Sequence, residues 1–479
     1  MTEQSRWLIN GKWTTEGGSG TFEVRDPANG DVVGTGVNAD PEDAERAIEA
    51  AHAAFKTWSR TPPPERGEVL KAAARMARER QDELGELLSR EQGKPLSEAK
   101  GEVDGAAGAL EFFGEESWRI QGETMPTGKP NRHSHVVKQP YGVVTAISPW
   151  NYPLLLMSWK LGPALVTGNT VVAKPPTETP LALTKFIGLL AEAGAPNGVV
   201  NIVTGGGKAL GPALAQHPNV AKIAITGQTE TGKKVMEMAA SGLKRVSLEL
   251  GNHTPLLVFD DADVEAAAKG AAKRAFRNAG QVCNSINRIY VHNSIKDSFV
   301  EKAVDAINGM TIDRGLNDPD VGAMCTASAL EKPKAHVQDA LSKGAQALTG
   351  GGPPEGDQYA NGNFFAPTLL DDVNHDMLVM QEETFGPVAG VMGFDSVDEA
   401  IDLANDTPYG LVAYVYTQDL ATTYRASQEL EYGTIGVNNV SGGNFPFPYA
   451  GWKQSGIGVE NSHYATEQYL QLKHVRIDL

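Results

Sequence analysis

The first third of the chain alternates apolar and polar residues with the period of an α-helix. In residues 40–58, Asp40 can cap the first turn, and apolar side chains return every three or four positions. A run of three prolines follows and interrupts the pattern. We expect a second helix from Glu65 towards Arg90 and a third over Leu96–Trp118. The N-terminal part therefore reads as largely helical.

Beyond residue 140 the pattern changes to short apolar runs, rich in Val and Ile, that alternate with helical stretches. Five such runs come in succession: Val143–Ile147, Thr170–Ala173, Val199–Val203, Lys222–Ile225 and Val246–Leu250. A second alternation begins at Thr254, with strands expected at Pro255–Phe259 and Arg288–Val291 and helices from Asp263 and from Lys296. Buried parallel strands joined by helices have this signature, so the pattern predicts a doubly wound α/β protein.

Composition narrows the class of protein further. The 479 residues carry a formal net charge of -17, which argues against nucleic acid or an anionic membrane as the main partner. Residues 1–10 lack the basic start and apolar core of a secretory leader, and the apolar stretch Tyr152–Trp159 is too short to span a bilayer. Two cysteines cannot make a disulfide framework, and no cluster has zinc-ligand spacing. A cytoplasmic location is expected.

One cysteine stands in a chemically suggestive setting. Cys283 follows a glycine-containing turn and precedes a strand in the segment FRNAGQVCNSINRIYV. Taken alone, a single cysteine is more often a small buried apolar residue than a nucleophile. Catalysis would need its thiolate form, favoured by a helix dipole or a nearby base. The residue by itself therefore leaves both interpretations open.

Two further segments place polar groups where a strand ends or a turn is rigid. Glu249 closes an apolar strand, where a carboxylate is either paired or used as a general base. His253 nearby could suggest a Cys/His hydrolase, but we interpret it as a structural loop residue. Asn151 lies between Trp150 and Tyr152, flanked by prolines, so its amide is either a preorganised oxyanion donor or a simple turn former.

Together these segments resemble the aldehyde dehydrogenase superfamily. The motifs PWNYP, LELG, GQVC and EETFGP occur in that family's order, and the similarity runs from WLINGKW near the start to YLQLKHV near the end. Each motif is moderately specific, whereas all four in order are very specific. The resemblance implies a non-acylating, NAD(P)-dependent enzyme that oxidises an aldehyde to a carboxylic acid, with Cys283 as its nucleophile.

The resemblance also implies a division of roles in the chemistry. Asn151 and the backbone N–H of Cys283 would hold the oxyanion of a thiohemiacetal, and Glu249 would activate the water that hydrolyses the thioester. Lys160 and Glu460 match positions that the family uses to relay protons to that glutamate; an ion pair that only braces the core is the alternative.

Cofactor residues follow in the same way. The matching positions for the dinucleotide are Ile147, Ser148, Pro149, Trp150, Lys174, Thr177, Gly205, Thr226, Gly227, Gln228, Leu250, Glu383 and Phe385. Members that prefer NAD usually carry a glutamate where this chain has Thr177. A glutamate there would repel a 2′-phosphate, so we expect NADP to be accepted as well as NAD, and even preferred.

The substrate is indicated less sharply. Tyr152, Trp159 and Arg277 match the substrate tunnel, and Arg277 stands where succinic semialdehyde dehydrogenases bind a distal carboxylate. Their second arginine is replaced here by Trp159, which favours a small or medium aliphatic or aromatic aldehyde and leaves the semialdehyde as the alternative. An acylating, CoA-dependent relative would usually lack Glu249, and a non-catalytic structural relative would be expected to lose Cys283.

The fold implied by the resemblance has three parts. Residues 1–121 and 141–251 would form a Rossmann-like cofactor domain and residues 252–450 an α/β catalytic domain. Residues 122–140 and 451–479 would supply a protruding β oligomerisation arm and the C-terminal segment. In the family this arm pairs with a neighbouring subunit, so we expect a homodimer or homotetramer.

Overall fold

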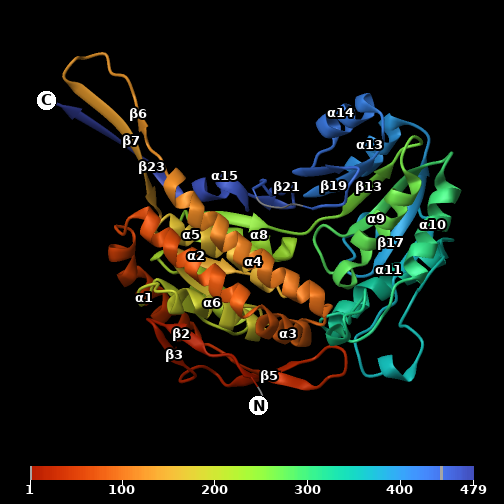
Figure 1. Cartoon of the computed structure of the whole chain (residues 1–479), viewed down its shortest axis with the longest axis horizontal. Helices are drawn as coiled ribbons and strands as arrows, with labels where there is room; N and C mark the ends of the chain where they lie inside the picture. The colour runs from red at the N-terminus through yellow and green to blue at the C-terminus, as the bar shows by residue number, and fades with distance from the viewer. Residues whose placement is uncertain (1–2, 443–445) are drawn as a thin grey trace.

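The computed structural model describes residues 3–442 and 446–479. It consists of two lobes, each built on its own sheet, and an arm that projects from one of them (Figure 1). The predicted spans 1–121 and 252–450 include residues 1–2 and 443–445, which lie outside the described residues. The expected α/β class, with a Rossmann-like domain, a second α/β domain and a protruding β arm, is confirmed.

The first lobe holds an eight-stranded sheet of order β22-β12-β11-β8-β9-β10-β2-β3. Its strands are β2 (Trp7–Ile9), β3 (Lys12–Thr14), β8 (Val143–Ile147), β9 (Thr170–Lys174), β10 (Val200–Ile202), β11 (Val220–Thr226), β12 (Arg245–Glu249) and β22 (Gly456–Ile457). The five central strands are parallel, as their near-continuous apolar sequences predict. The chain moves outward from β8 through β9 and β10, then returns to β11 on the other side. The crevice between the carboxyl ends of β8 and β11 is the usual ligand site of such a sheet.

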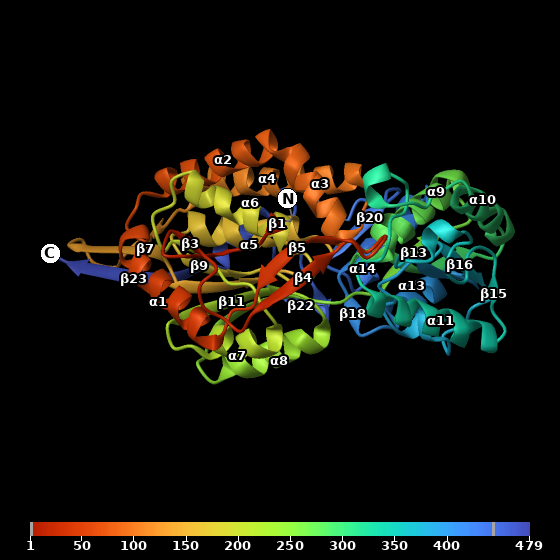
Figure 2. The same cartoon turned by 90° about the horizontal axis from the view of Figure 1, so that it is seen from below.

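Helices cover both faces of this sheet (Figure 2). One layer contains α2 (Pro63–Glu79), α3 (Gln81–Gln92), α4 (Leu96–Glu116), α5 (Pro153–Val166) and α6 (Leu181–Glu192), and the other contains α1 (Pro41–Trp58), α7 (Gly207–Gln216) and α8 (Thr229–Ala240). The expectation of one helix over Glu65–Arg90 is wrong. The backbone leaves helical geometry at Arg80, with φ -106° and ψ 21°, so that each half can bury its own apolar stripe.

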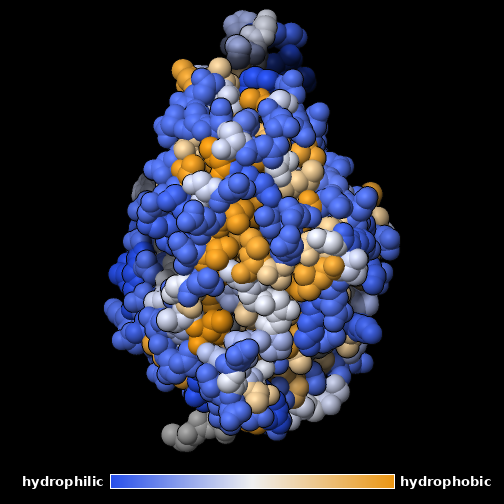
Figure 3. Space-filling view, turned by 90° about the vertical axis from the view of Figure 1, so that its right-hand side faces the viewer, coloured by the Kyte–Doolittle hydropathy of each residue, from blue (hydrophilic) through white to orange (hydrophobic). Residues whose placement is uncertain are grey.

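The second lobe holds a seven-stranded sheet of order β15-β16-β17-β14-β13-β19-β20. Its strands are β13 (Thr254–Val258), β14 (Ile286–His292), β15 (Gln346–Ala347), β16 (Thr368–Asp371), β17 (Val388–Phe394), β19 (Val412–Tyr416) and β20 (Thr434–Val437). Its helices are α9 (Val264–Phe276), α10 (Lys296–Asn308), α11 (Glu331–Ser342), α12 (Leu378–Gln381), α13 (Val397–Asn405) and α14 (Leu420–Glu429). The outer face of this lobe is mostly hydrophilic, with some apolar residues gathered along its middle (Figure 3).

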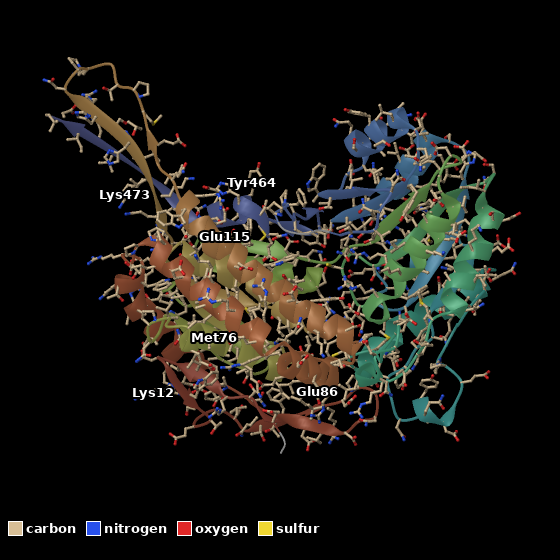
Figure 4. The ribbon with its side chains drawn as sticks, viewed as in Figure 1. Lys12, Met76, Glu86, Glu115, Tyr464 and Lys473 are labelled. Carbon is tan, nitrogen blue, oxygen red and sulfur yellow. The ribbon has the colours of Figure 1, made fainter. Side chains whose placement is uncertain are left out.

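The arm is a three-stranded antiparallel sheet of order β23-β7-β6. β7 (Arg132–Pro140) pairs along its whole length with β23 (Leu470–Asp478), and β6 (Glu123–Thr124) adds a short edge. Lys473 lies on β23, and Tyr464 points outward from α15 (Ser462–Glu467) near the base of the arm (Figure 4). Short strands β1 (Glu3–Gln4), β4 (Thr21–Arg25) and β5 (Val32–Val37) form a small N-terminal sheet, and β18 (Tyr409–Gly410) pairs with β21 (Trp452–Lys453).

Candidate active site

Two cavities meet at Cys283. One, of about 510 Å³, is lined by residues that follow β8, β11 and β12, together with the segment around Glu383 and Phe385. The other, of about 570 Å³, is lined by α5, the end of α9 and the segment around Tyr449. Asn151, Leu156 and Cys283 line both cavities. A molecule in either cavity would therefore face the same sulfur.

The backbone before Cys283 is unusually constrained. Asn278, Ala279 and Gly280 occupy the left-handed region in succession, with φ of 48°, 52° and 72°. A Cβ on Gly280 would lie 2.1 Å from the carbonyl oxygen of Gly386, so only glycine fits there. This turn ends α9 and places Cys283 between the two lobes. Strained backbone of this kind persists where the surroundings enforce it, often at functional sites.

The sulfur of Cys283 is buried and packs against the apolar core of the second lobe. Burial raises the pKa of its thiol to about 12, and the negative charges of Glu383 and Glu249 act in the same direction. The hydroxyl of Tyr449 lies 3.4 Å from Sγ, and this hydrogen bond lowers the pKa. The resting thiol is therefore protonated near neutral pH, and its reactivity depends on groups that stabilise the thiolate.

Asn151 is held rigidly beside this sulfur. Its side-chain Nδ2 donates to the Gln281 carbonyl at 2.8 Å, and its backbone carbonyl accepts from Lys94 Nζ at 2.6 Å. An amide nitrogen has two hydrogens, so one remains for an oxygen in the cavity. Asn151 is thus a firmly held amide at the junction of the two cavities, the kind of donor that suits an oxyanion.

Glu249 lies at the end of β12, and its side chain is fully enclosed. Neither carboxylate oxygen has a hydrogen-bond partner among the described residues, and the N–H of Gly451 faces the group without reaching hydrogen-bond geometry. Burial, together with the charge of Glu460, raises the pKa of Glu249 well above its ordinary value. A carboxyl group of this kind can take a proton from water near neutral pH.

The two residues expected to relay protons form a buried ion pair. Lys160 Nζ lies 2.7 Å from Glu460 Oε1 and also donates to Thr226 Oγ1 at 2.6 Å. The second oxygen of Glu460 has no partner among the described residues. The positive charge of Lys160 lowers the pKa of Glu249, which shows that the pair and the glutamate act on each other electrostatically.

Most of the predicted cofactor residues come together in the first cavity. Its lining includes Pro149, Trp150, Thr226, Gly227, Gln228, Leu250, Glu383 and Phe385. The Trp150 and Phe385 rings pack edge to face at 5.5 Å, and Glu383 Oε1 accepts from the Asn252 N–H at 3.0 Å. The Thr226 hydroxyl accepts a hydrogen bond from Lys160, which leaves its own hydrogen to donate to a phosphate oxygen.

The remaining predicted cofactor residues lie outside this cavity. Ile147 and Ser148 end β8, Lys174 ends β9, and Gly205 follows β10 with φ of 142°. Thr177 lines a separate cavity with Glu178, Asn38 and Gly206. Lys174 is buried, and its Nζ donates to the Pro175 carbonyl at 3.2 Å. These positions all follow neighbouring parallel strands, so they lie along one edge of the first sheet.

A dinucleotide fits the residues that are present. α8 begins at the cavity, and the side chain of its N-cap residue Gln228 does not cap the helix, so the first backbone N–H groups face open space. A helix N-terminus in this state suits a pyrophosphate. A Cβ on Gly206 or Gly207 would meet nothing within 4 Å, which leaves room for an approaching ligand.

All three predicted substrate residues, Tyr152, Trp159 and Arg277, line the second cavity. Arg277 Nε donates to Glu98 at 2.7 Å, and its guanidinium lies over the Tyr152 ring at 5.2 Å. Tyr152 also hydrogen-bonds to Glu98. Glu98 thus orders Arg277 at the edge of the cavity while other N–H groups of the guanidinium stay available.

The sequence interpretation missed two residues in this cavity. Arg274, one turn before Arg277 on α9, is buried and donates to the Tyr414 hydroxyl at 3.0 Å. Its position in the last turn of a helix was compatible with simple capping, so nothing in the pattern singled it out. Tyr449 comes from an irregular segment rich in Pro and Phe that has no periodicity. His253, by contrast, is buried with Nε2 2.9 Å from the Val379 carbonyl and makes no contact with Cys283, as its structural interpretation predicts.

Comparisons with known proteins agree with this arrangement. The profile described as the aldehyde dehydrogenase family matches residues 13–475, so the chain belongs to that family and is an oxidoreductase that acts on aldehydes. Succinate-semialdehyde dehydrogenase [NADP(+)] GabD of Escherichia coli K12 is 42% identical over 98% of this chain and 97% of its own length. The 3-sulfolactaldehyde dehydrogenase of Pseudomonas putida is 41% identical over 98% and 96%, respectively.

A solved structure extends the agreement to three dimensions. Betaine aldehyde dehydrogenase of Staphylococcus aureus in complex with NAD⁺ aligns with a TM-score of 0.96 at 36% identity, over 99% of this chain and 95% of that one. Either NAD or NADP is therefore compatible with the cofactor cavity, as the sequence predicts. Within residues 3–442 and 446–479, no helix combines the length and apolar character needed to cross a bilayer.

Proposed function

We propose that this protein oxidises a small aldehyde that carries an anionic group at its far end, with NADP as a cofactor it accepts and even prefers. The observation that carries the substrate assignment is a cluster of three cationic side chains, Lys273, Arg274 and Arg277, in the cavity that contains Cys283. Glu98 offsets one of these charges through its ion pair with Arg277, so a net positive charge remains. An anionic group would be attracted to that end of the cavity.

The chemistry assigned to Cys283 begins with addition of its thiolate to the aldehyde carbon. The π electrons move to oxygen, which the free N–H of Asn151 and the backbone N–H of Cys283 stabilise. When bound, NAD(P) accepts the hydride that leaves this carbon. A thioester on Cys283 results. The first cavity, where Trp150, Glu383 and Phe385 lie, would hold the cofactor against the same sulfur.

Hydrolysis of the thioester is assigned to Glu249. Its carboxylate takes a proton from water as the oxygen attacks the carbonyl carbon, and Cys283 leaves as the thiolate. The carboxyl proton must then reach solvent. The Lys160–Glu460 pair lies beside Glu249, and one oxygen of Glu460 is unpartnered among the described residues, which supports a relay through this pair.

The names of the relatives support an anionic substrate. A succinate semialdehyde carries a carboxylate beyond the aldehyde, and a sulfolactaldehyde carries a sulfonate. This chain has Trp159 in place of one arginine expected of succinic semialdehyde dehydrogenases. Arg274, in the last turn of α9, supplies a second guanidinium to the cavity that Arg277 lines from just beyond the end of that helix. The aromatic side chains of Tyr152, Trp159 and Tyr449 line the same cavity.

A comparison of aldehydes of equal length tests the substrate assignment. We expect kcat/KM for succinic semialdehyde to exceed that for butanal by about 100-fold, since a charge-assisted contact contributes about 1.5–3 kcal/mol. Arg274→Leu should raise KM for the semialdehyde and leave butanal unaffected. Lys269→Met, which removes a charge on the exposed side of the same helix, is the matched control. Equal efficiency for the two aldehydes would contradict the assignment.

The cofactor assignment concerns the cavity around Thr177. Thr177 Oγ1 lies 3.1 Å from Glu178 Oε2, so the acid is turned towards the threonine hydroxyl. The uncharged Thr177 leaves room for a 2′-phosphate, whereas Glu178 would have to turn away from it. We expect kcat/KM to be at least comparable for NADP and NAD. A hundredfold preference for NAD would contradict this.

The arm is assigned to self-association. Most side chains of β23 are exposed, and β6 covers only a short part of the outer edge of β7. An open strand edge of this kind is usually paired or protected. We propose a homodimer or homotetramer in which residues 122–140 and 451–479 contact a neighbouring subunit, within the reducing cytoplasm that keeps both thiols free. Light scattering of a chain that ends before β23 should show loss of the oligomer.

A further inference from the structure

Backbone hydrogen bonds hold Tyr449 in place. Its N–H donates to the Glu460 carbonyl at 2.9 Å, and the Glu460 N–H donates back to the Tyr449 carbonyl at 2.8 Å. The ring packs against Trp159 with centroids 5.3 Å apart and is almost fully buried. The phenol therefore has a defined position before any substrate enters.

The hydroxyl of Tyr449 has two neighbours, an amide that donates a hydrogen bond to it and a sulfur that can accept one from it. Asn284 Nδ2 lies 3.4 Å from the hydroxyl oxygen, and Cys283 Sγ lies 3.4 Å away. The amide orientation of Asn284 is set by the Gly442 carbonyl, 3.4 Å from the same Nδ2, because a carbonyl can only accept. The tyrosine oxygen thus accepts from Asn284, and its hydrogen is free to point at the sulfur. The chain of donors runs from Asn284 through Tyr449 to Cys283.

Few other groups around Cys283 can stabilise a negative charge on its sulfur. Glu383 and Glu249 oppose the thiolate, and Arg274 favours it from a greater distance. Among the described residues, Tyr449 is the side chain whose hydrogen bond lowers the pKa of the thiol. The pKa of Tyr449 itself is raised well above its ordinary value by burial and by Cys283, so the phenol keeps its proton over the whole working pH range.

We propose that the hydroxyl of Tyr449, polarised by Asn284, is the donor that stabilises the Cys283 thiolate and so sets the reactivity of the nucleophile. Tyr449 is a positioning residue in this account, since it acts through the sulfur. The inference rests on the proposed function in that Cys283 is the nucleophile. It adds an activating group that none of the sequence motifs contains.

Alkylation by iodoacetamide measures thiolate formation without cofactor or aldehyde. The rate at Cys283 is followed as a function of pH by mass spectrometry of its peptide, which separates it from Cys325. In Tyr449→Phe we expect the midpoint of the profile to move up by about one pH unit, so that alkylation below the midpoint is about tenfold slower. Because the pKa of the thiol is raised to about 12, the comparison is made on the rising part of the profile below the midpoint. Phenylalanine lacks only the hydroxyl, so access of the reagent to the sulfur is not reduced.

Two further variants keep the test decisive. Tyr416→Phe removes a buried hydroxyl that lies against Gly270, away from Cys283, and should leave the profile unchanged. Asn284→Ala removes only the outer donor and should shift the midpoint in the same direction by a smaller amount. An alkylation rate in Tyr449→Phe that equals or exceeds that of the wild type on the rising part of the profile overturns the inference. Failure of the proposed function would be seen separately, as aldehyde turnover that survives Cys283→Ala.

Discussion

The cavity on the cofactor side of Cys283 and the cavity on its substrate side are built in different ways. The cofactor side is lined partly by residues that follow parallel strands of the first sheet, such as Gly227 after β11 and Leu250 after β12, and partly by the segment around Glu383 and Phe385 from the second lobe. The substrate side consists of long side chains, such as Arg274 and Tyr449, from a helix end and an irregular segment. The first sheet fixes one wall of the cofactor cavity, whereas the packing of individual side chains fixes the walls of the substrate cavity. Relatives can therefore share one cofactor site and differ in their aldehydes.

The largest effect is expected at the point that both cavities share. Cys283→Ala should lower kcat by at least about 10³-fold with any aldehyde, because the covalent step is lost. Reduction of NADP followed by absorbance is the measurement. Cys325→Ala is the control for loss of a thiol and should keep most of the activity at saturating cofactor. The backbone N–H of Cys325 donates to Gln281 Oε1 at 2.9 Å, and the residue lines the cavity of Thr177 rather than either of the two cavities that meet at Cys283. Turnover that persists in Cys283→Ala would contradict the assignment of Cys283 as the reactive group at which the two cavities meet.

Glu249→Gln tests the proposed base of the hydrolysis step, and it should lower steady-state turnover by about 10²-fold or more. The pKa of Glu249 is raised by burial, and only the ionised form can accept a proton from water. The hydrolysis rate should therefore rise with pH through this raised pKa and fall below it. In Glu249→Gln the rate should be low and should lose this rise. A variant profile that rises with pH as in the wild type would assign the base to another group.

Gly280 tests whether the turn before Cys283 is as constrained as its backbone indicates. Gly280→Ala adds a Cβ that would lie 2.1 Å from the Gly386 oxygen, so we expect a loss of stability on the order of 2 kcal/mol and a clear loss of activity. Gly194→Ala has φ of 102° but nothing within 4 Å of the new Cβ, and should cost about 1 kcal/mol without loss of activity. Thermal unfolding and turnover are measured on both variants. Equal behaviour would show that the turn can adjust.

Thr177 gives the smallest effect and concerns the cofactor side alone. Thr177→Glu should lower kcat/KM for NADP about tenfold relative to NAD, because a carboxylate would face the 2′-phosphate. The relative efficiencies for succinic semialdehyde and butanal should not change. Thr179→Val, two positions along the chain, is the control. It removes a hydroxyl that donates to the Trp150 carbonyl at 3.3 Å and adds no charge. If Thr177→Glu also altered the choice of aldehyde, the two cavities would not be independent.

Polar residues at the ends of strands could be singled out from the sequence, whereas Arg274 and Tyr449 could not, for a physical reason. Glu249 and Thr226 follow apolar runs of regular period, and the carboxyl ends of parallel strands converge at one edge of a sheet. Arg274 and Tyr449 reach the cavity through the end of α9 and through a backbone bridge between Tyr449 and Glu460, which link residues distant in sequence. Periodicity carries no information about such contacts. The break in the helix at Arg80 was not predicted for a related reason. The residues on both sides of it continue the same apolar pattern.

The central claim is that the sulfur of Cys283 bonds to the carbon of an aldehyde bound in one cavity, and that this carbon then releases its hydride towards the other cavity. Glu249→Gln tests it most directly when it is mixed with NADP and an aldehyde that the wild type oxidises. The account predicts a burst of one reduced cofactor per subunit and an acyl group on the Cys283 peptide, found by mass spectrometry. A burst without that adduct, or an adduct on another residue, would contradict it.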